Sequence, residues 1–388
     1  MKIVFYSVIL NHHQAPVADE LWNLCKGEYR FVELMPPNEE INKGGRKYDD
    51  RPYLIRPWRS ETEKTEAMQL AMTADVCVFG GDLSLPYQKA RLKKNLLSFE
   101  AGERWLKRGY INLISPRLIK MIASYHLLGW RKKPLYKLCA SAYAANDQYL
   151  LGTFKGKCFK WGYFTDVKQI NVSELNDRKR KDETVLIMWC GRFIDWKHPE
   201  IVLRLAKEMK LEGLNVHFDL YGDGPMLKEM KTYAHVEGVE DIVSFYGICP
   251  NEFITTAMKE HHLFLMTSDR NEGWGAVANE AMGNGCTLIA CREAGSIPFL
   301  INDGVNGMMY GKDDFKSLVA MVKRVVRDRG LRESMSEKGF KTIMEEWSPK
   351  LAANRLLELS QSLIAGANNI SLDGPCSIAK PVKKGVIV

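Results

Sequence analysis

The fold follows from one segment of the chain, Ser268-Asp269-Arg270-Asn271-Glu272-Gly273-Trp274-Gly275-Ala276-Val277-Ala278-Asn279-Glu280-Ala281-Met282-Gly283-Asn284-Gly285. The apolar run from Leu263 to Met266 precedes it and predicts a buried strand, and residues 276–282 predict the opening of a helix. A strand, a loop and a helix in this order place the loop at the carboxyl edge of a sheet. The first amides of such a helix have no partner one turn earlier, so this edge suits an anion such as a pyrophosphate.

Two carboxylates frame this turn, with Glu272 in the loop and Glu280 inside the helix. Gly273 and Gly275 lie between them and let the backbone approach a ligand closely. Carboxylates repel phosphate, so we expect these acids to accept hydrogen bonds from hydroxyl groups, one set on a sugar and the other on a ribose. The alternative is that Glu272 is a solvated loop residue and that Glu280 is a helix acid placed for the dipole.

Two earlier strand-to-helix loops of the C-terminal half contain further candidate binding residues. The run from Val185 to Cys190 predicts a strand buried on both faces. Arg192 and Lys197 follow it, five residues apart in one loop, and both cations can reach the same anion. Surface salt bridges are the alternative. The next predicted strand, 215–221, ends in Gly222-Asp223-Gly224-Pro225 at the same edge.

Length and alternating strand and helix signals predict two α/β domains, since 388 residues exceed one ordinary core. We predict an N-terminal domain over 1–170, a polar linker over 171–183 and a C-terminal domain over 184–347. A helix over 348–366 and a loosely ordered tail over 367–388 follow. The nine cysteines are scattered without a Cys-x-x-Cys pair, and no apolar run approaches the ~20 residues of a membrane helix. A reduced, cytoplasmic protein is therefore expected.

The N-terminal half offers candidate site residues after two of its predicted strands. His12 and His13 follow the first strand, and either could be a general base or a hydrogen-bond donor. Glu100 ends the strand predicted over 96–100, and Glu103 and Arg104 lie in the turn that follows it. Helix capping is the alternative for the histidines, and an ordinary charged turn is the alternative for the other three.

The net charge of +8 is unevenly distributed. Residues 89–160 contain sixteen Lys or Arg and only three acids, interspersed with Leu, Ile, Trp and Tyr. This mixture could bind an anionic membrane surface, or it could form the solvated faces of helices. No nucleic-acid-binding motif accompanies it, so no nucleic acid partner is expected.

Three motifs together resemble the C-terminal domain of glycosyltransferase family 4, the retaining GT-B enzymes. They are Gly191-Arg192-(x4)-Lys197, Tyr221-Gly222-Asp223-Gly224-Pro225 and Glu272-(x7)-Glu280, and the resemblance covers roughly residues 183–366. It implies two Rossmann-like domains facing across a cleft. The second would hold a UDP- or GDP-linked sugar donor, the first would hold the acceptor, and no metal or other cofactor would be needed.

The resemblance also assigns roles by position. Arg192 and Lys197 match the pair that grips the donor diphosphate, Glu280 the acid that accepts from the ribose, and Glu272 the one that meets the sugar hydroxyls. The backbone of Gly273, Trp274 and Gly275 would contact sugar and phosphate, and Gly191, Gly222 and Gly224 are counted with the donor-binding residues. Many members have a glycine-rich loop where this chain has residues 11–16. His12, His13, Glu100 and Glu103 therefore compete for the acceptor-side role, for which we select His13 and Glu103.

The implied activity is transfer of a hexose-type sugar, with retention, to a glycan or lipid-linked acceptor during synthesis of surface polysaccharide or another glycoconjugate. The basic region would suit peripheral binding to the inner face of the membrane. Two alternatives stay open: a GT-B-like nucleotide-sugar epimerase, and a non-catalytic protein that binds nucleotide sugars. The C-terminal helix in such enzymes commonly crosses back to the first domain, so residues 348–366 are expected to do so.

Overall fold

The structure is a computed structural model that describes residues 1–36, 48, 50–166, 168–367 and 369–382. The chain folds as two compact units. Unit 1 contains Met1–Asp166 and Trp347–Val388, and unit 2 contains Val167–Glu346. Each unit is built on a parallel sheet flanked by helices, which confirms the prediction of two Rossmann-like α/β domains.

Unit 1 contains a sheet with the strand order β3-β2-β1-β4-β5-β6-β7, in which every pairing is parallel. The strand order reverses between β1 and β4, and ligands of such sheets bind beyond the carboxyl ends of the strands at this point. The strands are β1 (Ile3–Ser7), β2 (Tyr29–Glu33), β3 (Leu54–Ile55), β4 (Val76–Gly80), β5 (Ser98–Gly102), β6 (Leu135–Cys139) and β7 (Cys158–Lys160).

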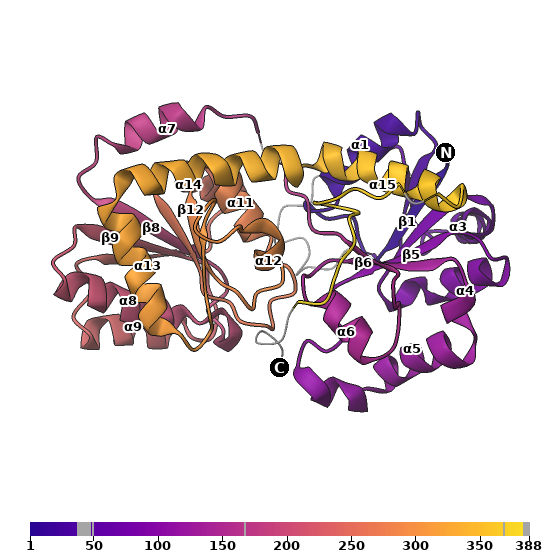
Figure 1. Cartoon of the computed structure of the whole chain (residues 1–388), viewed down its shortest axis with the longest axis horizontal. Helices are drawn as coiled ribbons and strands as arrows, with labels where there is room; N and C mark the ends of the chain where they lie inside the picture. The colour runs from indigo at the N-terminus through magenta and orange to yellow at the C-terminus, as the bar shows by residue number, and fades with distance from the viewer. Residues whose placement is uncertain (37–47, 49, 167, 368, 383–388) are drawn as a thin grey trace. The chain divides into compact units, whose positions relative to one another are not determined.

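The helices of unit 1 come from both ends of the chain. The C-terminal helix α15 packs against α1, and the two are seen together in Figure 1. Ser60 and Ser348 cap the starts of α3 and α15 through their hydroxyl oxygens. The helices are α1 (Ala15–Leu24), α3 (Glu61–Thr73), α4 (Leu85–Lys93), α5 (Pro116–Leu127), α6 (Ala144–Leu150) and α15 (Pro349–Ile364), with short turns η1 (Asp82–Ser84), η2 (Gly109–Ile114) and η3 (Trp130–Lys132).

Unit 2 contains a parallel sheet in the order β10-β9-β8-β11-β12-β13. Its strands are β8 (Val185–Cys190), β9 (Val216–Tyr221), β10 (Val243–Gly247), β11 (Leu263–Met266), β12 (Thr287–Cys291) and β13 (Met308–Tyr310). The strands β9, β8 and β11 are neighbours, so the loops that follow them share one edge of the sheet.

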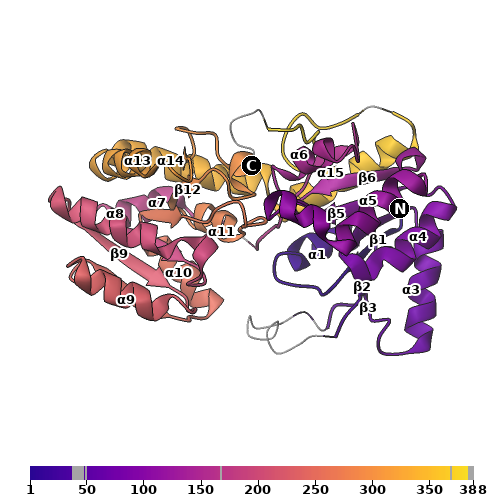
Figure 2. The same cartoon turned by 90° about the horizontal axis from the view of Figure 1, so that it is seen from below.

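The helices of unit 2 cover this sheet, and α13 and α14 lie side by side (Figure 2). They are α7 (Val172–Lys179), α8 (Pro199–Leu211), α9 (Leu227–Val236), α10 (Asn251–Glu260), α11 (Val277–Gly283), α12 (Ile297–Leu300), α13 (Phe315–Arg327) and α14 (Arg329–Lys341), with the short elements η4 (Asp195–Lys197) and η5 (Thr342–Glu346). In the part of the chain that the structure describes, no helix combines the length and the apolar composition needed to cross a bilayer.

The prediction of a linker over 171–183 is wrong, because most of this segment forms α7. Asn171 begins the helix by accepting a hydrogen bond from the Glu174 amide at 3.3 Å. Its apolar side is buried, and a methyl group on Gly285 would lie only 3.4 Å from Leu175. Lys179 is also buried and donates to the Gly285 carbonyl at 2.9 Å. The polar segment is thus a packed part of unit 2.

The prediction of a loosely ordered tail is wrong for residues 369–382. The tail runs antiparallel to β7, with hydrogen bonds from the Lys160 amide to the Ser377 carbonyl and from the Ala379 amide to the Cys158 carbonyl, at 2.8 and 2.9 Å. Cys376 and Ser377 are fully buried. Pairing with this edge satisfies backbone groups that an edge strand would otherwise expose. Residues 383–388 lie outside the described part of the chain.

Candidate functional site

The carboxyl edge of the unit 2 sheet brings two of the predicted donor-binding residues into direct contact. Lys197 follows β8, Glu272 follows β11, and the Lys197 Nζ and the Glu272 Oε2 form an ion pair. Both side chains are largely buried. The Thr267 hydroxyl donates to the Lys197 carbonyl at 2.5 Å, which joins the two loops a second time. A fixed lysine and a fixed carboxylate therefore lie together where the motifs predicted a donor site.

Two glycines of the β9 loop allow it to meet the β8 loop. A Cβ atom on Gly222 would lie 1.9 Å from the Gly191 carbonyl oxygen, and one on Gly224 would lie 2.5 Å from that of Phe193. Both glycines have positive φ, at 125° and 156°. The Phe193 amide donates to the Asp223 carbonyl at 2.9 Å. These glycines fix the backbone of the Arg192–Lys197 loop, and their contact with the donor stays a prediction.

The turn before α11 is held rigidly. Gly275 has a φ of 82°, and a Cβ atom there would lie 2.2 Å from Met266 Cε. Trp274 is 1% exposed, and its Nε1 donates to Asn279 Oδ1 at 2.8 Å. The Gly295 amide donates to the Glu272 carbonyl at 3.2 Å. The Trp274 ring therefore belongs to the core, and only its backbone can serve the ligand contact that the resemblance implied.

A histidine that the sequence analysis missed joins the same two loops. His198 Nε2 lies 3.3 Å from Asp269 Oδ2, and its Nδ1 lies 2.9 Å from Glu200 Oε1. The hydrogen bond to Asp269, together with that to Glu200, raises the pKa of His198 to about 9, so the ring is charged at neutral pH. His198 directly follows Lys197, and this adjacency was the only signal in the sequence, because Asp269 lies 71 residues away.

The other two predicted donor-binding side chains, Glu280 and Arg192, lie outside the Lys197–Glu272 ion pair. Burial raises the pKa of the Glu280 carboxyl to about 7. Arg192 is exposed, and its guanidinium lies 5.7 Å from the centre of the Trp196 ring. The structure thus holds Lys197 against a carboxylate and leaves Arg192 in solvent on an aromatic face. Their joint binding of a diphosphate stays a prediction.

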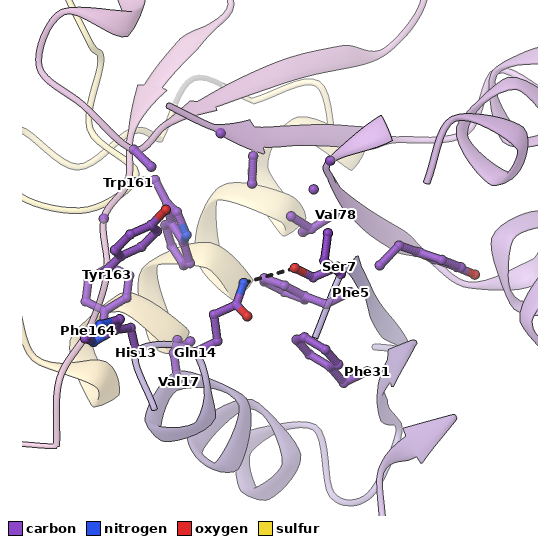
Figure 3. A pocket seen from close by; sticks show the side chains of 18 of the residues that line it. Phe5, Ser7, His13, Gln14, Val17, Phe31, Val78, Trp161, Tyr163 and Phe164 are labelled. Carbon is purple, nitrogen blue, oxygen red and sulfur yellow. Dashed lines mark hydrogen bonds between the residues drawn. The ribbon is translucent and has the colours of Figure 1, made fainter. Parts of the chain in front are cut away.

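In unit 1 the β1 loop opens into a cavity of about 190 Å³ (Figure 3). Its walls are mostly aromatic and aliphatic, including Phe5, Phe31 and Trp161, and the Gln14 amide donates to the Ser7 hydroxyl within it at 3.2 Å. His13 lies at the margin, and its ring stacks on Tyr163 with centroids 5.7 Å apart. The cavity lies beyond the carboxyl end of β1, at the reversal of strand order.

Of the two histidines, His13 is the one that lines this cavity. Burial, with a smaller effect from the neighbouring His12, lowers the pKa of His13 to about 3. An imidazole with this pKa is a weak general base at neutral pH. Burial also lowers the pKa of His12. The surroundings of His13 therefore favour hydrogen bonding to a hydroxyl group over proton removal.

The three charged candidates at β5 are paired: Glu100 lies within the strand itself, and Glu103 and Arg104 follow it. Glu103 Oε1 accepts from the Tyr163 hydroxyl at 2.8 Å, and its Oε2 lies 3.2 Å from Lys107 Nζ. Glu100 pairs with buried Lys137 at 2.8 Å. Arg104 pairs with fully buried Asp147 at 2.9 Å, which indicates a structural role. His13 and Glu103 line different cavities, and Tyr163 connects them by stacking on one and donating to the other.

Residues 173–342, which fall within unit 2, match the family described as "Glycosyl transferases group 1". Alpha-D-kanosaminyltransferase from Streptomyces kanamyceticus is 27% identical over 184 residues, which are 47% of this chain and 47% of that protein. The lipopolysaccharide core biosynthesis glycosyltransferase LpsD from Rhizobium meliloti (strain 1021) is 26% identical over 183 residues, 47% of this chain and 51% of that one. The chain thus spans about half the length of these curated relatives.

The similarity to solved structures extends over both units. The Anabaena protein Alr3699/HepE in complex with UDP has a TM-score of 0.69 and 15% identity, covering 93% of this chain and 100% of that chain. WaaG, a glycosyltransferase involved in lipopolysaccharide biosynthesis, has a TM-score of 0.58 and 16% identity, with coverage of 91% and 98%. At these identities the similarity establishes the fold, which is GT-B. Together with the family match over unit 2, it supports the relationship to GT-B glycosyltransferases that the motifs indicated.

Proposed function

We propose that this chain is a retaining glycosyltransferase that moves a hexose-type sugar from a nucleoside-diphosphate donor to a glycan or lipid-linked acceptor. The observation that carries the proposal is the arrangement of Lys197, Glu272 and Glu280. Lys197 and Glu272 are paired at the carboxyl edge of β8 and β11, and Glu280 lies on the helix that follows. All three lie in the segment that matches the glycosyltransferase family.

The chemistry requires stabilisation of charge that develops on the leaving group. Cleavage of the bond between the anomeric carbon and the phosphate oxygen builds negative charge on the diphosphate. Lys197, joined by Arg192 from the same loop, would stabilise that charge without a metal ion. One preorganised group of this kind commonly lowers the barrier by about 3 to 4 kcal/mol. Glu272 would orient the sugar through its hydroxyls, and Glu280 would accept hydrogen bonds from the ribose.

The acceptor is assigned to unit 1, where His13 and Glu103 are the candidate contacts. Two relatives are named as glycosyltransferases of colanic acid biosynthesis (putative) and of lipopolysaccharide core biosynthesis, and these names favour an acceptor of surface polysaccharide synthesis.

Exposed apolar side chains on and around η2 and α5 support contact with a lipid surface. They are Tyr110, Ile111, Leu113, Ile114, Ile119, Leu127 and Leu128. Three exposed basic residues, Arg108, Lys120 and Lys132, lie close to them in the chain, so we infer a peripheral position on an anionic cytoplasmic membrane face.

The test is donor binding and turnover. Purified chain is screened against UDP- and GDP-linked hexoses by thermal shift and by slow hydrolysis of the donor. UDP-hexoses are tried first, because structures of the similar fold contain UDP. We expect donors of one nucleotide class to stabilise the chain. The affinity for them should be at least tenfold weaker in Glu280→Ala.

The products distinguish the alternatives. Free sugar with retained configuration supports a transferase that uses water in place of the acceptor, whereas an epimerised nucleotide sugar would identify an epimerase. Binding without any turnover, in the presence of acceptor glycans, would leave a nucleotide-sugar-binding protein. Absence of stabilisation by any nucleotide would refute the proposed donor site.

A further inference from the structure

Unit 1 contains a second and larger cavity, of about 420 Å³, beside the one that His13 lines. It lies between the carboxyl ends of β4 and β5 and the helices α4 and α5, and η2 contributes Asn112. Gly81, Ala101 and Gly102 line both cavities, so the two spaces adjoin. A volume within the range of roughly 300 to 1,000 Å³ is typical of pockets that bind small molecules.

The charges in this cavity neutralise one another in pairs. Lys137 Nζ lies 2.8 Å from Glu100 Oε1, and Arg117 Nε lies 2.6 Å from Asp82 Oδ2. Glu103 forms the third pair, with Lys107, and the fourth cation of the lining, Arg104, pairs with Asp147 behind it. Because each of these cations already has a carboxylate partner, the lining offers no uncompensated charge to an anionic ligand. A neutral ligand with many hydroxyl groups matches such a lining, since paired ions still offer both donors and acceptors.

Gln88 is an independent indication that the cavity suits a polar ligand. This residue of α4 is one of those that line the cavity, and it is 1% exposed. Its Nε2 has no hydrogen-bond partner among the described residues, although buried amide groups are normally satisfied. A ligand hydroxyl in the cavity would accept this hydrogen bond. Asn112 and Ser115 add short polar groups to the same lining, and Trp105 adds an aromatic one.

We propose that this cavity is an acceptor subsite that binds an uncharged sugar ring of the glycan, with the Gln88 amide donating to one of its hydroxyls. The inference rests on the proposed function, which it deepens by naming the part of the acceptor that unit 1 recognises. A sugar seated here would direct its neighbouring ring or hydroxyl towards the adjoining cavity and His13. The selectivity of this site would then depend on Gln88 and on the open volume next to Met121.

The experiment uses saturation-transfer NMR on the full chain with methyl α-D-glucopyranoside, methyl α-D-galactopyranoside and methyl N-acetyl-β-D-glucosaminide as probes, and inorganic phosphate as competitor. Gln88→Leu removes the amide, and Met121→Trp fills the cavity from α5. Gln69→Leu on α3 and Ile364→Trp on α15 are the matched controls, since both positions are exposed and neither lines the cavity. We expect binding of at least one glycoside to fall about tenfold in each cavity variant, to stay unchanged in both controls, and to resist phosphate.

Thermal shift by UDP-glucose is measured on the same samples and reports on unit 2 alone. The subsite is refuted if the wild type binds none of the glycosides. It is also refuted if Met121→Trp binds them as tightly as the wild type does, or if phosphate displaces them. A different outcome is that the cavity variants lose glycoside binding but UDP-glucose stabilises no sample. That outcome would support a sugar site in unit 1 and would refute the proposed transferase function. The two conclusions are thereby separable.

Discussion

At the scale of single residues, Glu280 predicts how donor binding depends on pH. Burial raises its pKa to about 7, so it is partly protonated in the free protein at neutral pH. Ribose hydroxyls that donate to the carboxylate stabilise its ionised form, so donor binding should release a proton below about pH 7. The affinity for UDP-glucose should therefore rise as the pH increases from 5.5 to 7.5, by up to roughly tenfold per unit below the pKa, and level off above it.

Isothermal titration in buffers of different ionisation enthalpy measures both the affinity and the proton release. Glu280→Gln is the control, with weak binding that does not change over this pH range. UDP-glucose is preferred to UDP, because its diphosphate is esterified at both ends and does not titrate near pH 6. An affinity in the wild type that is constant between pH 5.5 and 7.5 would remove Glu280 from the ribose site.

Glu272 allows a second prediction, because the donor diphosphate has to compete with it for Lys197. Glu272→Gln frees the lysine and removes a negative charge, so UDP should bind several-fold more tightly. Turnover of UDP-hexose should fall at least a hundredfold, since the sugar loses its orienting carboxylate. Titration with UDP and a hydrolysis assay check the two effects, and circular dichroism checks the melting temperature, which should change little. Full turnover would show that Glu272 has only a structural role.

At the scale of elements, the C-terminal segment is predicted to stabilise unit 1. It covers the β7 edge with backbone hydrogen bonds, and its own residues Cys376, Ser377 and Ala379 are buried. Deletion of residues 367–388 should lower the free energy of unfolding of unit 1 by about 2 to 4 kcal/mol. Differential scanning calorimetry should detect a decrease in the melting temperature of several degrees. Leu372→Ser, at a fully exposed position of the same segment, is the matched control and should leave it unchanged; equal effects of the deletion and of this substitution would contradict the stabilising role of the segment.

The same segment shows why some elements could be predicted and others could not. The bounds of β8 and β11 agree with the sequence patterns, and α15 lies within the helix predicted over 348–366, because apolar runs and helical periodicity are local signals. The tail has no such period, and its order comes from pairing with β7, more than 200 residues away in the chain. The helix α7 has a single apolar turn, Val172 and Leu175, within a highly charged segment. Its stability depends on packing against Gly285, which composition does not reveal.

At the scale of the whole molecule, the candidate residues of unit 2 were more predictable than those of unit 1. The unit 2 residues follow three neighbouring strands, so the rule for parallel sheets places them at one edge. In unit 1 the role of each candidate depends on its interaction partner, and these partners lie far away in the chain. Arg104 is held by Asp147, whereas Glu103 accepts from Tyr163. Neither pairing has a signature in the sequence, and the same holds for His198 and Asp269 in unit 2.

The uneven charge of the molecule leads to a prediction about membranes. Arg108, Lys120 and Lys132 are exposed in the basic region, near the exposed apolar residues of η2 and α5. Each basic residue close to an anionic surface contributes about 1 kcal/mol, so reversal of all three to Glu should weaken binding to phosphatidylglycerol vesicles by roughly a hundredfold or more. Co-sedimentation at 50 and 300 mM salt checks this, because screening should weaken the wild type at the higher concentration.

Reversal of Lys228, Lys231 and Lys338, three exposed lysines of unit 2, changes the net charge by the same amount and is the matched control. If local charge next to apolar side chains directs the binding, this control should bind phosphatidylglycerol vesicles like the wild type. Neutral phosphatidylcholine vesicles should bind neither the wild type nor this control. Equal losses in the two triple variants would instead mean that net charge alone attracts the protein. Unaltered partitioning of the first variant would leave the basic region as ordinary solvated surface, and the acceptor would then have to reach unit 1 without help from the bilayer.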